Sequence, residues 1–136
     1  MKTYVHAKIQ GLTVTAAELE YSGSATIDAA LLDASGIEPY QEVQVIDLVN
    51  GNRLTTYAIA GGPGEFQMNG GAALLVGVGH RCIVISYQMT ASFEGAKVVF
   101  VGEGNRAVRT LEYPLMADEL AYVGQANQPV PNPRPV

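Results

Sequence analysis

The residues best suited to chemistry are an adjacent pair, Gly23 followed by Ser24. A serine hydroxyl can attack the carbonyl carbon of the residue before it, and a glycine there leaves that carbonyl unhindered and its backbone free to strain. Taken alone, a glycine within an extended segment more often marks a β-bulge or a close approach between two backbones. The pair therefore indicates chemistry only in the company of other functional residues.

A second group of such residues follows Asn50-Gly51, a dipeptide typical of a tight hairpin turn. Arg53 can bind a carboxylate through two hydrogen bonds, since its planar guanidinium matches that group and keeps its charge. Thr56 adds a hydroxyl and Tyr57 a proton donor. Adjacent strand residues point to opposite faces, so both can serve one site only if it lies between strands or subunits, or if the backbone twists locally.

Composition excludes several functions. A formal net charge of -5 with only eight Lys and Arg argues against a nucleic-acid partner, because phosphate binding needs a basic patch. The two histidines, His6 and His80, form no metal-ligand pattern, and a lone cysteine excludes a disulfide framework. That cysteine, Cys82, lies in an apolar run and is expected to be a buried, inert thiol.

The N-terminus shows neither the apolar core nor the cleavage site of a signal peptide, and no segment approaches the length that spans a bilayer. We therefore expect a cytoplasmic protein with no membrane partner. The carboxylates Asp28, Glu38, Glu42 and Asp47 are expected to be solvated charges or helix-end partners, because no spacing forces two of them together. His80 is expected to be structural.

The chemistry-bearing residues lie among short β-rich segments separated by glycine turns. The pattern predicts strands over residues 1–14, 19–27, 43–48, 54–59, 81–88 and 97–101. It predicts a helix from Asp28 to Ser35 that Gly36 ends, a shorter helix over 72–76, and a capping box at 15–18 that opens one short turn. Pattern alone indicates a small barrel or sandwich and does not choose between them.

The C-terminal end differs from the rest in composition. Five of the seven prolines lie beyond Tyr113, and the segment 128–136 can neither pair in a sheet nor continue a helix. We expect a first unit over residues 1–113 and an extension over 114–136 with a Pro-rich flexible tail. A Pro-rich ligand for a partner domain is the alternative for this tail.

Four segments in order resemble the aspartate 1-decarboxylase family, whose members are pyruvoyl-dependent and process themselves. These segments are His6-Ala7-Lys8-Ile9 with Thr13-Val14-Thr15, Tyr21 to Asp28, Asn50 to Ile59, and Asn69 to Ala73. The likeness extends from about Tyr4 to Gln88, with spacing kept except for a shortened loop between Tyr57 and Asn69. Their order and spacing carry the resemblance, since no single tetrapeptide would.

The resemblance implies a mainly β fold, a six-stranded double-psi β-barrel with small helices, assembled as a homotetramer with sites between subunits. It implies cleavage between Gly23 and Ser24 into residues 1–23 and 24–136, which converts Ser24 into a covalently bound pyruvoyl group. That group would form a Schiff base with the substrate amine and accept the electrons released as carbon dioxide leaves. The implied activity is decarboxylation of L-aspartate to β-alanine, which feeds pantothenate synthesis.

The resemblance also assigns roles within the site. Ser24 supplies the cofactor, Tyr57 returns a proton to the substrate carbon, and Thr56 stabilises the oxyanion formed during cleavage. Arg53 binds one substrate carboxylate and Lys8 attracts the second. The remaining substrate-binding residues form one turn: Asn69, Gly70, Gly71 and Ala72.

The chain departs from the family pattern at Gln10 and Gly11, where a His-Arg pair is usual. Two charged or titratable groups are lost there, so we expect self-cleavage to be retained more surely than selectivity for aspartate. One alternative keeps the chemistry on a related amino acid, and another is an unprocessed barrel that acts as a binding or regulatory module. Whether cleavage requires a maturation partner stays open at the level of sequence.

Overall fold

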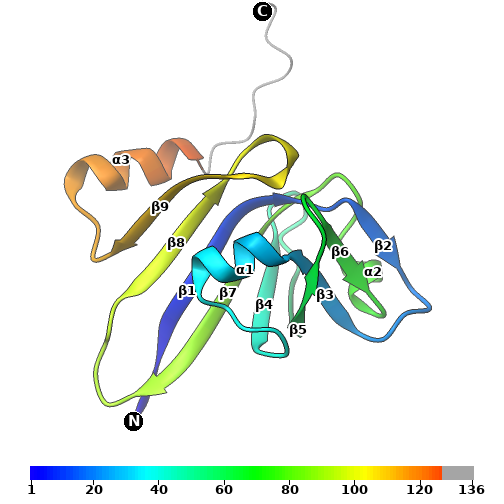
Figure 1. The fold of residues 1–136 in the computed structure, drawn as a ribbon, viewed down its shortest axis with the longest axis horizontal. Helices are drawn as coiled ribbons and strands as arrows, with labels where there is room; N and C mark the ends of the chain where they lie inside the picture. Colours follow the sequence, from blue (N-terminus) through cyan, green and yellow to red (C-terminus); the bar gives the residue numbers. More distant parts are fainter. Residues whose placement is uncertain (127–136) are drawn as a thin grey trace, which may run out of the picture.

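The computed structural model describes residues 1–126 and is mainly β, with a few short helices (Figure 1). Nine strands lie in one hydrogen-bonded order, β2-β6-β3-β5-β4-β7-β1-β8-β9. Their bounds are β1 Lys2–Thr13, β2 Ala16–Glu18, β3 Ser24–Asp28, β4 Glu42–Asp47, β5 Arg53–Gly61, β6 Phe66–Asn69, β7 Arg81–Thr90, β8 Ala96–Val101 and β9 Ala107–Tyr113. The helices are α1 Ala29–Ser35, α2 Ala72–Leu75 and α3 Ala117–Ala126, with one 3-10 turn, η1 Glu103–Asn105.

The main core is formed by buried side chains from β1, β3, β4, β5, β6, β7 and α1. Its largest fully buried side chains include Ile9, Leu12, Ile27, Phe66 and Met68. Figure 1 shows α3 against β8 and β9, apart from this core, and its Tyr122 and Val123 pack on a second cluster of Val98, Phe100 and Leu111. The strands that carry Ser24 and Asn69 therefore belong to the main core.

Local signals in the sequence predicted the first helix and the first hairpin correctly. Asp28 caps α1 by accepting a hydrogen bond from the Ala30 amide, and Gly36 ends it in the left-handed conformation with φ 83°. Strands β4 and β5 pair antiparallel around Asn50-Gly51. The strands expected over 81–88 and 97–101 are confirmed as β7 and β8, and the short helix near 72–76 is confirmed as α2.

Other expectations were wrong. Ala16–Glu18 is a strand that pairs parallel with β6 rather than a helical turn, because Thr15 bonds to Phe66 through its amide and hydroxyl instead of capping a helix. The strand expected over 19–27 begins only at Ser24, since residues 19–23 form a turn and bend. Strands β6 and β9 and helix α3 were not predicted.

The structure describes nine strands rather than six, and the order above ends at β2 and β9. Double-psi closure of a barrel stays a prediction. The Pro-rich tail expected over 128–136 lies outside the described residues. Within residues 1–126 no helix is long and apolar enough to cross a membrane.

Candidate active site

The candidate nucleophile, Ser24, begins β3 and is 1% exposed. Its hydroxyl donates to the carbonyl oxygen of Ser22 at 3.3 Å and accepts a hydrogen bond from Asn69 Nδ2 at 2.9 Å. Strands β3 and β6 pair antiparallel with Ser24 directly opposite Asn69, which explains why two distant residues meet. Asn69, which was predicted to bind substrate, therefore lies in direct contact with the candidate nucleophile.

A close contact between two turns holds the backbone at the cleavage pair. Gly70 has φ +66°, and a Cβ there would lie 2.8 Å from Gly23 Cα and 3.0 Å from both Gly23 N and the Tyr21 carbonyl oxygen. Only glycine accepts both this left-handed conformation and this approach. The Gly70 amide also donates to the Glu18 carbonyl at 2.8 Å. The turn after β6 is thus fitted against the peptide that precedes Ser24.

A pocket of about 510 Å³ lies at this contact. It is lined by Gly23, Leu54, Thr55, Thr56, Tyr57, Asn69, Gly71, Ala72 and Leu75. The short helix α2, which follows the turn at Gly71, supplies part of its wall. Six of the residues predicted for the site therefore surround one cavity, from three separate segments: Gly23, Thr56, Tyr57, Asn69, Gly71 and Ala72.

The strand register explains how Thr56 and Tyr57 reach the cleavage pair. Strands β3 and β5 run parallel with Ala25 opposite Ala58, so the residues just before Ala25 lie near the residues just before Ala58. Thr56 and Tyr57, which are adjacent on β5, both line the pocket. Tyr57 is 36% exposed, and its ring stacks on that of Tyr40 with centroids 6.4 Å apart.

Two predicted substrate-binding residues lie outside this pocket in a single chain. Arg53 donates from Nε to Gln44 at 3.0 Å and from a terminal nitrogen to the Tyr87 hydroxyl at 3.3 Å. Lys8 lies on β1 between β7 and β8, where its ammonium donates to the Tyr113 hydroxyl at 3.3 Å and lies 5.8 Å from the ring centroid. Neither lines the cavity at Gly23.

Comparison with known proteins identifies the family. The sequence pattern of the aspartate decarboxylase family matches residues 1–108. The chain belongs to this family. It is 47% identical over 116 residues to the aspartate 1-decarboxylase of Carboxydothermus hydrogenoformans, which covers 81% of this chain and 91% of that relative. It is 44% identical over 113 residues to the aspartate 1-decarboxylase of Acaryochloris marina, a match that covers 79% of this chain and 86% of that relative. It is 41% identical over 114 residues to the aspartate 1-decarboxylase of Thioalkalivibrio sulfidiphilus, a match that covers 79% of this chain and 90% of that relative.

Two residues that contact Asn69 were given no role in the sequence analysis. Gln67 donates from Nε2 to Asn69 Oδ1 at 2.7 Å, and the Thr26 hydroxyl accepts from Asn69 Nδ2 at 2.9 Å. Both follow from strand periodicity, because Thr26 lies two residues after Ser24 and Gln67 two residues before Asn69. A prediction of the β3–β6 pairing would have found them.

Asp47 and His80 form a pair that sequence analysis also missed. Asp47 is fully buried, contrary to the expected solvated charge, and accepts from His80 Nδ1 at 2.6 Å and from the amides of Val49 and Asn50. Burial alone would raise the pKa of Asp47, but the hydrogen bonds from His80 and the two amides, with the charge of His80, lower that pKa below its ordinary value. The side chains of Asn50 and Asn52 then donate to the Leu75 carbonyl, which ties this turn to α2.

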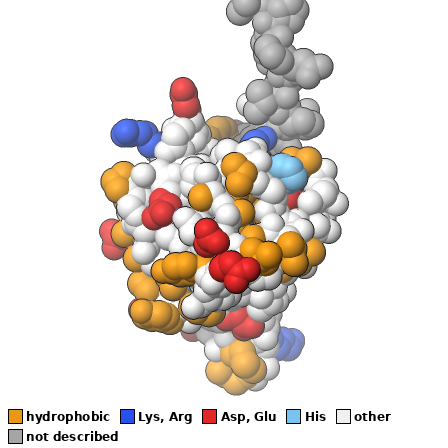
Figure 2. Space-filling model, turned by 90° about the vertical axis from the view of Figure 1, so that its right-hand side faces the viewer, with side chains coloured by type: hydrophobic (Ala, Val, Ile, Leu, Met, Phe, Trp, Pro, Cys, Tyr) orange, Lys and Arg blue, Asp and Glu red, His pale blue; other side chains and the backbone are white. Residues whose placement is uncertain are grey.

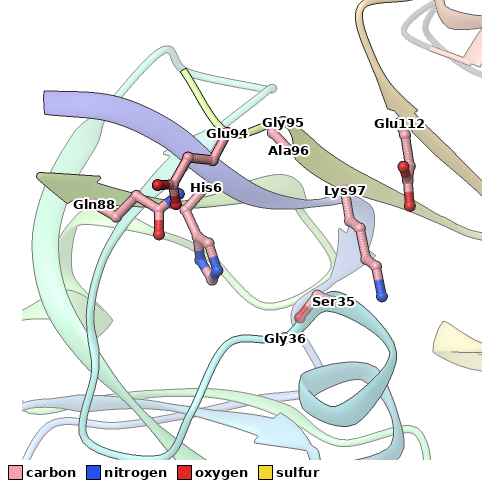
Figure 3. Close-up of a pocket in the computed structure, with 9 residues that line it drawn as sticks. All are labelled: His6, Ser35, Gly36, Gln88, Glu94, Gly95, Ala96, Lys97 and Glu112. Carbon is pink, nitrogen blue, oxygen red and sulfur yellow. The ribbon is translucent and has the colours of Figure 1, made fainter. Parts of the chain in front are cut away.

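A different pocket of about 360 Å³ lies away from the family residues (Figure 3). Figure 3 shows His6, Gln88 and Glu94 on one side of it and Lys97 with Glu112 on the other. Both acidic and basic side chains line this pocket, and none of the predicted site residues does. The only hydroxyl group at its wall, that of Ser35, donates to the Leu32 carbonyl within α1. The pocket at Gly23 is therefore the better candidate for the reaction.

No group of three or more His, Cys, Asp and Glu that could hold a metal ion occurs among residues 1–126. The predicted burial of Cys82 is confirmed, because it is fully buried in β7. Burial, helped by the negative charge of Asp47, raises the pKa of this thiol to about 12. Cys82 is therefore protonated near neutral pH and does not compete with Ser24 as a nucleophile.

Proposed function

We propose that this chain is the precursor of a carboxy-lyase that cleaves itself between Gly23 and Ser24 and then decarboxylates L-aspartate to β-alanine and carbon dioxide. One observation carries the proposal: Ser24 is buried, bonded to Asn69, and preceded by a glycine that lines a pocket with Thr56 and Tyr57. The family and the three relatives named aspartate 1-decarboxylase support the substrate. By the same family likeness, the product feeds pantothenate synthesis and the enzyme acts in the cytoplasm.

The self-cleavage step balances with water as the only added reactant. Ser24 Oγ attacks the Gly23 carbonyl carbon, the C–N bond breaks, and the hydroxyl proton passes to the freed nitrogen, which leaves an ester. Loss of the α-proton with cleavage of the Cβ–O bond releases Gly23 as a carboxylate. A proton added at Cβ converts the resulting enamine into an imine, and water then replaces its nitrogen as ammonia and leaves a pyruvoyl group at position 24. Thr56, which lines the same pocket as Gly23, would stabilise the oxyanion of the first step.

The residues around position 24 fit such a group. Asn69 already aims two N–H donors at the hydroxyls of Ser24 and Thr26, so an amide donor is in place for a carbonyl oxygen there. The pyruvoyl carbonyl supplies an electrophile and an electron sink. Tyr57, on the wall of the same pocket and partly exposed, holds a proton on its hydroxyl for the carbon that loses its carboxyl group.

We place the complete site between subunits of a homotetramer. Arg53 and Lys8, which would bind the two carboxylates of aspartate, lie outside the pocket of their own chain. Figure 2 shows hydrophobic side chains in several groups over the face that carries β2, β6 and α2. Exposed apolar residues near the pocket include Leu19, Tyr21, Leu74, Leu75 and Val78, of which Leu74 is 73% exposed. A second copy would cover these residues and bring its cations to the pocket.

Intact mass spectrometry tests the proposal directly. The purified chain should yield two fragments, residues 1–23 and 24–136, whose summed mass equals that of the precursor plus water minus ammonia. Ser24→Ala should remain whole, because it has no hydroxyl to attack with. A parent chain that remains whole, or a Ser24→Ala chain that is cut at the same bond, would contradict it. Assays with aspartate, glutamate and cysteine sulfinate then decide the substrate.

A further inference from the structure

The buried amide of Asn69 is held at both ends. Its Nδ2 donates to Ser24 Oγ and to Thr26 Oγ1, each at 2.9 Å, and its Oδ1 accepts from Gln67 Nε2 at 2.7 Å. Ser24 lies opposite Asn69 and Thr26 opposite Gln67 in the antiparallel β3–β6 pair. The four side chains therefore form two neighbouring cross-strand pairs on one face of the sheet.

The direction of this amide decides what Ser24 can do with its hydroxyl. The Ser24 proton is given to the Ser22 carbonyl, so Ser24 Oγ can only accept from Asn69. Asn69 must then turn its nitrogen toward Ser24 and its oxygen the other way, where Gln67 donates to it. Without that donor, the Asn69 Oδ1 would be buried without a hydrogen-bond partner. A rotation of the amide that turns this oxygen toward the hydroxyls of Ser24 and Thr26 would then be favourable, because both hydroxyls can donate to it. Ser24 would then donate to Asn69 and lose its present orientation.

We propose that Gln67 is a positioning residue for self-cleavage: by donating to Asn69 it fixes the amide that orients the Ser24 hydroxyl toward its attack. Gln67 touches neither the scissile peptide nor Ser24 in any hydrogen bond of the network, so it acts through Asn69 alone. The inference rests on the proposed function of Ser24 as the cleavage nucleophile. It adds a residue that the site predicted from sequence did not contain.

The test compares cleavage rates of freshly folded precursor by intact mass. Gln67→Glu keeps the shape but offers only acceptors at neutral pH, so we expect cleavage to slow about tenfold or more. Gln67→Met removes the donor without adding charge and should slow cleavage several-fold, which keeps the test decisive if the charged variant folds poorly. Gln88→Glu makes the same chemical change on β7, outside the network, and should cleave at the parental rate.

A pH series separates positioning from a general structural defect. As the pH falls toward the ordinary range of a glutamic acid, near 4.3, the introduced carboxyl gains a proton and can donate to Asn69 again. The rate of Gln67→Glu relative to the parent should therefore rise, while that of Gln67→Met should stay level. Parental cleavage rates in both Gln67 variants, or a deficit in Gln67→Glu that does not recover at lower pH, would overturn the inference.

A second readout separates this inference from the proposed function. If the parent itself remains whole, the proposed function fails, and hydrogen exchange of the Asn69 side-chain amide by NMR decides the orientation of the amide. Slow exchange in the parent and in Gln88→Glu, with fast exchange in Gln67→Met, would support the network. Equal exchange in all three would overturn it.

Discussion

Gly70→Ala tests whether the turn after β6 holds the cleavage pair in place. The substitution adds one methyl group at φ +66°, where a left-handed alanine costs on the order of 1–2 kcal/mol. The methyl would also meet Gly23 Cα at 2.8 Å and the Tyr21 carbonyl at 3.0 Å, which are backbone atoms that cannot rotate away. Overpacking of this kind costs about 1–3 kcal/mol. We therefore expect the free energy of unfolding to fall by roughly 2–5 kcal/mol.

The same contact predicts a defect in cleavage. The turn can accommodate the methyl only by shifting Gly23 or the peptide at Tyr21, and attack by Ser24 depends on the position of the Gly23 carbonyl. A misplacement that adds about 1.4 kcal/mol to the barrier slows a reaction tenfold, so Gly70→Ala should cleave at least about tenfold more slowly. Intact mass over time gives the rate, and urea unfolding at one fixed protein concentration gives the stability.

Gly51→Ala is the matched control for backbone strain. Gly51 has φ +79°, and nothing lies within 4 Å of a Cβ built there. This variant should lose only the left-handed cost, on the order of 1–2 kcal/mol, and should cleave at the parental rate. If the two variants lose equal stability and cleave equally fast, the contact between Gly70 and Gly23 does not hold the cleavage pair, and the reasoning is wrong.

Three further outcomes are expected. Arg53→Ala should chiefly raise KM and Tyr57→Phe chiefly lower kcat, with cleavage normal in both, in steady-state assays; normal activity in both would place the site elsewhere. The folded pKa of Asp47 lies below its ordinary 3.8, so the stability that its carboxylate contributes is present above that value and is lost as the pH falls through the lowered pKa. Removing His80 removes one cause of this lowering. Urea unfolding between pH 7 and pH 3 should therefore show a smaller acid-induced loss of stability in His80→Ala than in the parent. Cys82, with its pKa raised to about 12, should resist iodoacetamide in the folded protein and react once unfolded; alkylation at equal rates would contradict its burial.

The sequence predicted the elements that depend on neighbouring residues. Asp28 and Gly36 mark the ends of α1, and Asn50-Gly51 marks the β4–β5 turn, because caps and tight turns are decided by local backbone preferences. The pairing of β2 with β6 joins segments far apart in the chain, and three-residue β2 has no periodicity of its own. Long-range pairing of this kind overrode the local capping signal at residues 15–18.

The candidate site likewise contains residues that the sequence could predict and residues that depend on long-range pairing. The family resemblance assigned Gly23, Thr56, Tyr57 and Asn69 to one site, and these four residues line one pocket, while their roles in the reaction stay predictions. Gln67 could not be found in this way, because its role depends on the register of two strands rather than on a motif. Arg53 and Lys8 were predicted for the same site, yet neither lines this pocket in its own chain, so their role at it stays a prediction that depends on the proposed assembly.

Gly11 shows how a departure from a family pattern can have a structural cause. We expected Gln10 and Gly11 to weaken selectivity for aspartate, because they replace charged or titratable groups after Lys8. Gly11 has φ +96°, and a Cβ there would lie 2.9 Å from the Val101 carbonyl oxygen. Both features favour glycine at this position regardless of substrate. Gly11 also lines a different cavity, of about 510 Å³, rather than the one at Gly23, and Gln10 is 2% exposed between β7 and β8. An arginine introduced at position 11 would strain the β1–β8 contact before it reached a substrate, so a selectivity test belongs at Lys8 and Arg53, whose side chains are free of that constraint.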